Sequence, residues 1–310
     1  MTQEHIKDSD QRSAESPTPQ HRVFWFDDGS IVLQAQQQRF RVHYRFLSRL
    51  SPFFSSQRFG TISPDHVVEL ASEILATDFE ALLMHLYHDR PLSPKMQIDH
   101  IASILRITSP RLLDFPAIHA SAKELFIGMF PTGPTPNYHP AKITEALAVA
   151  TEYNLSPVRK TLFYSIITTS EVDFYAVDDG GSSAEIESEP ENSPMEGSTP
   201  SSKQKITPND ARCCAMLMEK LIEHFTPILF TPATTPHMAC TDVFADTWMT
   251  LIVQPALEDE GVYKPVETLE RFKSIDWAKQ GLCESCVVEK REEWTAEQHV
   301  IWDKIDRWLA

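Results

Sequence analysis

The spacing of apolar residues changes once near the N-terminus, and this change constrains the fold of the 310-residue chain more than any other feature. Apolar runs at 23–26 and 31–33 flank turn residues at 27–30, and residues 39–43 alternate polar and apolar with a period of two. Immediately afterwards, apolar residues recur every three to four positions, as in a helix. Residues 67–70 predict one further strand. Short strands, including a hairpin, followed by helices predict an α+β first domain.

Three sites carry signals for the start of a helix. Residues 77–80 read Thr-Asp-Phe-Glu, a capping box in which Thr77 and Glu80 would satisfy free backbone N–H groups. Ser156 and Thr207 are each followed by a proline, which predicts an N-cap with proline in the first helical turn.

Composition divides the chain into five segments. Residues 1–21 are polar and show no periodicity, so we expect a disordered lead-in. Residues 176–206 are rich in Ser, Glu, Asp, Pro and Gly and hold no aromatic residue, which predicts a disordered acidic insertion. The remaining segments predict a first domain at 22–131, a helical extension at 138–175 and a helical C-terminal domain at 207–310.

Charge and composition exclude several classes of protein. A formal net charge of -16 would repel a phosphate backbone, so we expect no direct binding of nucleic acid. No apolar run approaches the roughly 18 residues of a membrane span, and the start lacks a signal-peptide pattern. We therefore expect no membrane contact and an intracellular protein, cytoplasmic or nuclear, whose five cysteines are reduced. Nucleophile-elbow and phosphate-loop patterns are missing from the sequence, so we expect no catalytic residues, no cofactor and no enzyme.

The first domain carries a resemblance to a known family. A short strand, a second strand ending in Phe-x-Val-His, and a helix with a Ser-x-x-Phe end are similar to the opening of a BTB/POZ domain. The segment at 25–29, and Cys283-x-x-Cys286 near the C-terminus, resemble a fungal, mainly basidiomycete, branch of that family. The residues that carry the N-terminal resemblance are Phe24, Trp25, Phe26, Asp28, Phe40, Val42, His43, Leu47, Phe53 and Phe54.

The resemblance implies a binding platform that performs no chemistry. BTB/POZ domains commonly self-associate as homodimers or dock protein partners through helical surfaces. The partner is a cullin-type ubiquitin-ligase scaffold in some families and a transcriptional corepressor in others, which implies an adaptor role here. His43 would tie a strand to a helix, and Trp25, Phe26, Phe53 and Phe54 would be core or dimer-face aromatics.

Four possible metal ligands occur as two pairs near the C-terminus. His237-x-x-Cys240 and Cys283-x-x-Cys286 have the ligand number and pair spacing of a structural zinc site. Because their separation fixes no geometry, we favour free thiols packed in a helical domain, with a zinc-stabilised structural protein as the alternative. A thiol oxidoreductase using Cys283 and Cys286 is less favoured, since the pair precedes a helix and lacks a βαβ context.

Overall fold

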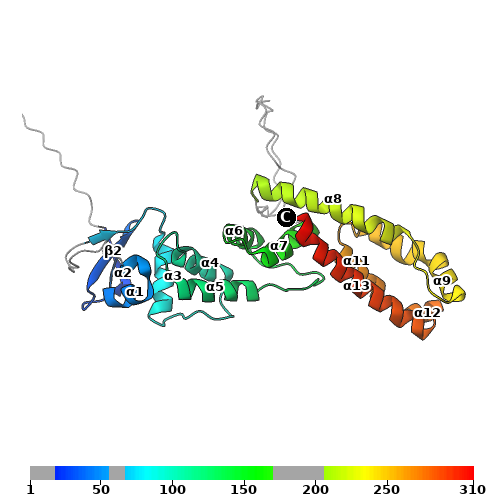
Figure 1. Ribbon diagram of the computed structural model, residues 1–310, viewed down its shortest axis with the longest axis horizontal. Coiled ribbons are helices and arrows are strands. Elements are labelled where there is room, and N and C mark those ends of the chain that lie inside the picture. Colours follow the sequence, from blue (N-terminus) through cyan, green and yellow to red (C-terminus); the bar gives the residue numbers. More distant parts are fainter. Residues whose placement is uncertain (1–17, 56–66, 170–205) are drawn as a thin grey trace, which may run out of the picture. The chain divides into compact units, whose positions relative to one another are not determined.

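The computed structural model divides into two compact units, unit 1 at Met1–Phe126 and unit 2 at Ile127–Ala310 (Figure 1). It describes residues 18–55, 67–169 and 206–310. Nearly all of the predicted lead-in at 1–21 and insertion at 176–206 lies outside the described residues. None of the helices in the described ranges combines the length and the apolar character needed to cross a membrane.

Unit 1 begins with a small mixed sheet. Its strands are β1 (Gln20–Trp25), β2 (Ile31–Ala35), β3 (Gln38–Val42) and β4 (Val67–Glu69). The order β1-β3-β2-β4 puts β2 and β3 in the middle, where they form an antiparallel hairpin closed at Gln36. Strand β1 runs parallel to β3, and β4 runs parallel to β2. The predicted hairpin is present, but the turn at 27–30 connects an edge strand to a central strand with which it does not pair.

The His21 side chain forms hydrogen bonds at an irregularity in β1. The strand begins at Gln20, so Gln20 and His21 belong to the sheet and not to the disordered lead-in that we predict from composition. Where the register of β1 on β3 shifts, Nδ1 of His21 accepts hydrogen bonds from the backbone N–H of Val23 at 3.2 Å and of Phe24 at 3.0 Å. Nε2 lies 3.4 Å from the Glu80 carboxylate. The imidazole therefore satisfies two strand N–H groups that the distorted pairing could leave open.

Helices follow the sheet and complete the core of unit 1 (Figure 1). They are α1 (Tyr44–Leu50), α2 (Pro52–Ser55), α3 (Ala76–Leu86), α4 (Ile98–Thr108) and α5 (Pro116–Gly128). Phe40 of β3 and Phe79 of α3 are fully buried and meet edge-to-face with ring centroids 5.0 Å apart. Strands then helices around one core confirm the predicted α+β class.

The start of α3 shows that the predicted capping box is wrong. The helix begins at Ala76 with Leu75 at the N-cap, so Thr77 is already inside the helix and does not cap it. The Asp78 carboxylate, buried beside Thr77, accepts two hydrogen bonds from the Arg106 guanidinium of α4, each 2.9 Å long. The first turn of α3 thus takes part in a tertiary ion pair that the local sequence does not reveal.

All the secondary-structure elements in the described parts of unit 2, residues 127–169 and 206–310, are helices. Its elements are α6 (Ile143–Glu152), α7 (Ser156–Thr168), α8 (Pro208–Phe230), α9 (Met238–Trp248), the π-helical turn η1 (Met249–Val253), α10 (Gln254–Glu258), α11 (Pro265–Ser274), α12 (Trp277–Gln280) and α13 (Glu284–Trp308). The long helices α8 and α13 pack against each other, and α11 packs along α13 (Figure 1).

Two predicted helix starts in unit 2 have different outcomes. Thr207 is the N-cap of α8, and its hydroxyl accepts a hydrogen bond from the backbone N–H of Asp210 at 3.1 Å, as predicted. The prediction for Ser156 is wrong, because Leu155 occupies the N-cap of α7 and Ser156 is its first helical residue. Burial of Leu155 in the core of the unit places the helix start one residue earlier than the hydroxyl pattern indicates.

Aromatic side chains fill the part of unit 2 between α9, α11, α12 and α13. Phe244 of α9 meets the ring of Trp277 at 4.8 Å and that of Trp294 at 6.2 Å, in both cases edge-to-face. Trp277 is fully buried, and its indole N–H donates to the Phe272 carbonyl at 2.8 Å. This cluster packs α9 against α12 and α13.

Candidate metal centre and interaction domain

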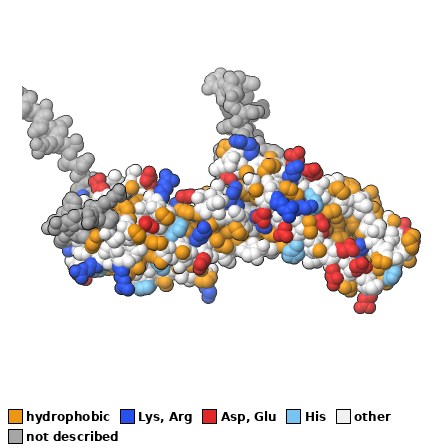
Figure 2. Space-filling model, viewed as in Figure 1, with side chains coloured by type: hydrophobic (Ala, Val, Ile, Leu, Met, Phe, Trp, Pro, Cys, Tyr) orange, Lys and Arg blue, Asp and Glu red, His pale blue; other side chains and the backbone are white. Residues whose placement is uncertain are grey.

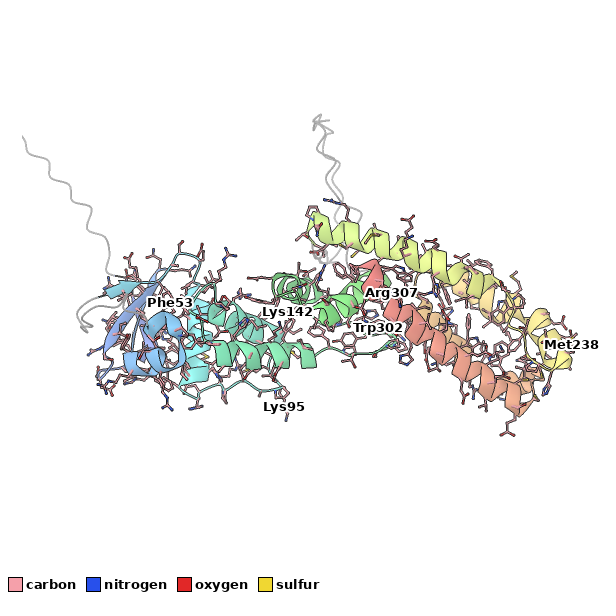
Figure 3. All side chains as sticks on the ribbon, in the orientation of Figure 1. Phe53, Lys95, Lys142, Met238, Trp302 and Arg307 are labelled. Carbon is pink, nitrogen blue, oxygen red and sulfur yellow. The ribbon has the colours of Figure 1, made fainter. Side chains whose placement is uncertain are left out.

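The residues that resemble a BTB/POZ domain form a buried set and a partly exposed set. The fully buried side chains are Phe24, Phe40, Val42, Leu47 and Phe54. The half-buried side chains are Trp25, Phe26, His43 and Phe53, the last of which is labelled in Figure 3. The Asp28 side chain is exposed. The buried set holds the sheet against the first helices, and the half-buried aromatics border the surface.

His43 connects the end of β3 to the end of α3 and to the turn after β1. Its backbone N–H donates to the Tyr87 hydroxyl at 3.2 Å, and its Nδ1 lies 2.9 Å from the same oxygen. Its Nε2 lies 3.2 Å from the Asp28 carboxylate. In the neutral imidazole, Nε2–H donates to Asp28 and Nδ1 accepts from Tyr87. The Tyr87 ring also contacts Phe26, with centroids 4.8 Å apart.

The Asp28, His43 and Tyr87 side chains connect three segments of unit 1. Burial raises the pKa of Tyr87, which is the opposite of what activates a phenol as a nucleophile. The hydrogen bond from His43 lowers the pKa of Asp28, so this exposed carboxyl group stays ionised at neutral pH. The three groups therefore hold a strand, a helix and a turn together.

Exposed apolar residues are sparse on unit 1. Among its described residues, the large apolar side chains that stand well exposed are Val23 on β1, at 61%, and Leu75 before α3, at 40%. Figure 2 shows Lys and Arg side chains interspersed with Asp and Glu on the face in view. Within the described part of unit 1, the edge strand β1 therefore presents the most exposed large apolar side chain.

The structure brings the four possible metal ligands of unit 2 together. The ligand atoms of His237, Cys240, Cys283 and Cys286 all lie within 4.8 Å of one another. Nδ1 of His237 is 3.1 Å from Sγ of Cys283 and 3.5 Å from Sγ of Cys286, and Sγ of Cys240 is 3.7 Å from Sγ of Cys283. His237 is exposed, Cys283 is half-buried, and the other two cysteines are buried.

Each ligand pair occupies the same two positions of a helix start. His237 is the N-cap of α9 and Cys240 lies in its first turn, while Cys283 and Cys286 have the same places in α13. Met238, labelled in Figure 3, marks the end of the unit where α9 begins. A three-residue spacing across an N-cap turns both side chains toward the same side of the helix start, so two such starts can converge on one point.

Hydrogen bonds make the two thiols of the Cys-x-x-Cys pair unequal. The Ser285 hydroxyl, the backbone N–H of Cys286 and the His237 imidazole lower the pKa of Cys283 to about 6. Burial raises the pKa of Cys286. A thiolate at neutral pH suits both a metal ligand and a redox nucleophile, so the pKa of Cys283 does not separate these two interpretations. The helical surroundings in the described part of unit 2 lack the βαβ context of a thioredoxin-like centre.

Sequence patterns did not reveal a buried polar contact between α7 and α11. The Tyr164 hydroxyl donates to the Glu267 carboxylate at 2.6 Å and accepts from the backbone N–H of Val266 at 3.0 Å. Burial, reinforced by the Glu267 charge, raises the pKa of Tyr164 well above 10. Tyr164 follows two apolar residues of α7, and a pattern of residue types gives no sign of its partner 103 positions away.

The four-stranded mixed sheet and the helices that follow it define unit 1 as a small α+β domain. The family model of the BTB/POZ domain matches residues 27–129. The chain therefore contains a BTB/POZ domain, a member of a non-enzymatic family of interaction domains. A comparison with curated proteins finds no match.

Proposed function

We propose that this chain is a protein-interaction module that self-associates through its BTB/POZ domain. The BTB/POZ domain at 27–129 carries the proposal, because domains of this family bind proteins and perform no chemistry. The contacts of His43 and Tyr87 support it. Their polar atoms form hydrogen bonds with each other and with Asp28, which is a structural use of these side chains.

The contact surface that we propose includes the outer face of β1. The family resemblance alone implies that partners bind to a helical surface. On the described part of unit 1, however, Val23 on the edge strand is more exposed than Leu75, the other well-exposed large apolar side chain. Nδ1 of His21 already accepts hydrogen bonds from the backbone N–H groups of Val23 and Phe24. We therefore expect a partner to contact the side chains of β1 and not to add a further strand to the sheet at these residues.

An adaptor role in the cytoplasm or nucleus is the finer proposal. The resemblance supports two partner classes, a cullin-type ubiquitin-ligase scaffold and a transcriptional corepressor. Purified full-length chain mixed with purified cullin scaffold should give a complex that co-elutes by gel filtration if the first class applies. Separate elution at micromolar concentrations of both proteins would remove the cullin from the account.

Self-association is tested by light scattering after gel filtration of the full chain over a range of loading concentrations. A monomer has a mass of 35.3 kDa, and we expect a species of twice this mass at micromolar concentration. The expected dimer has isologous contacts, so each copy contributes the same surface. A constant monomer mass up to high micromolar concentration would refute self-association.

A further inference from the structure

The convergence of two pairs of side chains on one point of unit 2 indicates a metal site outside the BTB/POZ domain. We propose that His237, Cys240, Cys283 and Cys286 bind one structural zinc ion that joins the start of α9 to the start of α13. The inference does not depend on the proposed interaction function. It reverses the preference that the sequence alone gives for free thiols, because the four ligand atoms lie within 4.8 Å of one another.

Two of the distances between ligand atoms match the edges of a zinc tetrahedron, and a third is slightly shorter. With Zn–S bonds of about 2.3 Å and a Zn–N bond of about 2.0–2.1 Å, a regular tetrahedron sets two sulfurs about 3.8 Å apart and a nitrogen about 3.6 Å from each sulfur. The Cys240 and Cys283 sulfurs are 3.7 Å apart, and Nδ1 of His237 is 3.5 Å from the Cys286 sulfur. The 3.1 Å separation of Nδ1 from the Cys283 sulfur needs an outward shift of a few tenths of an ångström.

The positions of these residues have no explanation in helix capping. Neither His237 nor Cys283 makes a side-chain capping bond at the N-cap that it occupies. By contrast, Thr207 at the start of α8 and Asp276 at the start of α12 each accept a backbone N–H, as N-cap side chains usually do. His and Cys at two N-caps, each with a Cys three residues later, are instead the side chains that a soft metal requires.

Neighbouring donors suit sulfur ligands in the thiolate form. The backbone N–H of Cys283 donates to Sγ of Cys240 at 3.5 Å, and the Ser285 hydroxyl lies 3.3 Å from Sγ of Cys283. Such contacts orient metal ligands and stabilise their charge. The N-terminal ends of α9 and α13 also place positive helix-dipole ends at the cluster.

One nitrogen and three sulfur ligands indicate zinc and a structural role. This donor set matches the Cys₃His class of closed tetrahedral zinc sites, in which the protein supplies all four ligands. Binding would exchange the thiol protons of three cysteines for one Zn²⁺, with no change in oxidation state and no oxidant required. A disulfide has sulfurs about 2.05 Å apart, far closer than the Cys240 and Cys283 sulfurs at 3.7 Å.

A zinc ion here would cross-link chain segments that are 43 residues apart at Cys240 and Cys283. Phe244, one turn after Cys240, already packs against Trp277 and Trp294 of the α12 and α13 region. The metal would therefore clamp the end of the unit next to its aromatic core, and its loss should loosen the starts of both helices.

The test is the zinc content of the full chain, purified without chelator and measured by inductively coupled plasma mass spectrometry. We expect about one zinc per chain, as a single closed site requires. Cys283→Ser and Cys240→Ser should lose the ion. Cys213→Ser, which alters a cysteine of α8 outside the cluster, should keep it.

Two further measurements keep the result interpretable if a variant folds poorly. His237→Cys should retain zinc, because it converts the site to four thiolates. Cobalt(II) added to the metal-free wild-type chain should give the intense visible bands of tetrahedral thiolate coordination. Chelation should raise hydrogen exchange at the starts of α9 and α13 and leave β3 unchanged.

Three results would overturn the proposal. The first is a reduced, folded wild-type chain that binds neither zinc nor tetrahedral cobalt. The second is a full zinc content in Cys283→Ser. The third is a Cys283–Cys286 disulfide in the chain purified without reductant, found by peptide mass spectrometry together with an absence of zinc; that result would favour the oxidoreductase alternative.

Discussion

Replacing Ser51 by alanine should lower the free energy of unfolding of the BTB/POZ domain by more than the removal of an exposed hydroxyl does. Ser51 ends α1 and precedes α2, and it is only 2% exposed. Its hydroxyl donates to the Leu113 carbonyl at 2.6 Å and accepts from the backbone N–H of Phe54 at 3.3 Å. One side chain therefore caps α2 and ties it to the segment after α4.

The magnitude follows from the two partners that Ser51→Ala leaves behind. Loss of a serine N-cap costs about 1 kcal/mol. A buried carbonyl left without its donor adds about 1–3 kcal/mol. Since the two hydrogen bonds share one hydroxyl, we expect the free energy of unfolding of unit 1 to fall by about 2–3 kcal/mol in total.

The assay must report on unit 1 alone, because five of the six tryptophans lie in unit 2. Hydrogen exchange of peptides from β2 and β3, followed by mass spectrometry over a urea series, isolates the unfolding of the sheet. The matched control is Ser55→Ala, which removes an exposed hydroxyl that donates to the Pro52 carbonyl within α2. Ser55→Ala should change stability by less than about 0.5 kcal/mol. Equal effects of the two substitutions would refute the reasoning.

Two further predictions concern buried polar contacts. Asp78→Asn should lower the stability of unit 1 by about 2 kcal/mol, less than for a fully buried ion pair because Arg106 is partly exposed. Denaturant unfolding should show part of this loss recovered when Arg106→Leu is added, and strictly additive losses would contradict a coupled pair. Tyr164→Phe should cost unit 2 about 1 kcal/mol at neutral pH. Because the pKa of Tyr164 is raised in the folded state, its contribution is present below the unfolded value of about 10 and is lost as pH rises above it. The variant should therefore lose less stability above pH 10 than the wild type, and parallel alkaline curves would count against this assignment.

Local patterns in the sequence predict the class of unit 1 and several of its elements. Period-two alternation around Phe40 and Val42 marks a strand with one buried face, and both side chains are buried in β3. The Thr207 hydroxyl and the following proline mark the start of α8 correctly, since an N-cap depends on atoms within four residues. Features of this kind need no knowledge of distant contacts.

Features that depend on distant residues could not be predicted in the same way. Composition assigns His21 to a disordered lead-in, yet its imidazole packs into the sheet because Val23 and Phe24 need acceptors. The Thr77 capping box fails because α3 already begins at Ala76, and the neighbouring Asp78 pairs with a residue 28 positions away. The sequence pairs the metal-ligand candidates only locally, and the fold of α9 onto α13 brings the pairs together.

The most direct test of the proposed interaction function compares the dimer dissociation constants of Val23→Lys and Val288→Lys by sedimentation equilibrium of the full chain. Val288 is the matched control, a valine of α13 that is 51% exposed. Burying one valine side chain stabilises a complex by about 1.5 kcal/mol or more, equivalent to about tenfold in the dissociation constant. We predict at least about tenfold weaker association for Val23→Lys and no change for Val288→Lys. Unchanged association of Val23→Lys would contradict the β1 contact, and a wild-type chain that remains monomeric would contradict self-association itself.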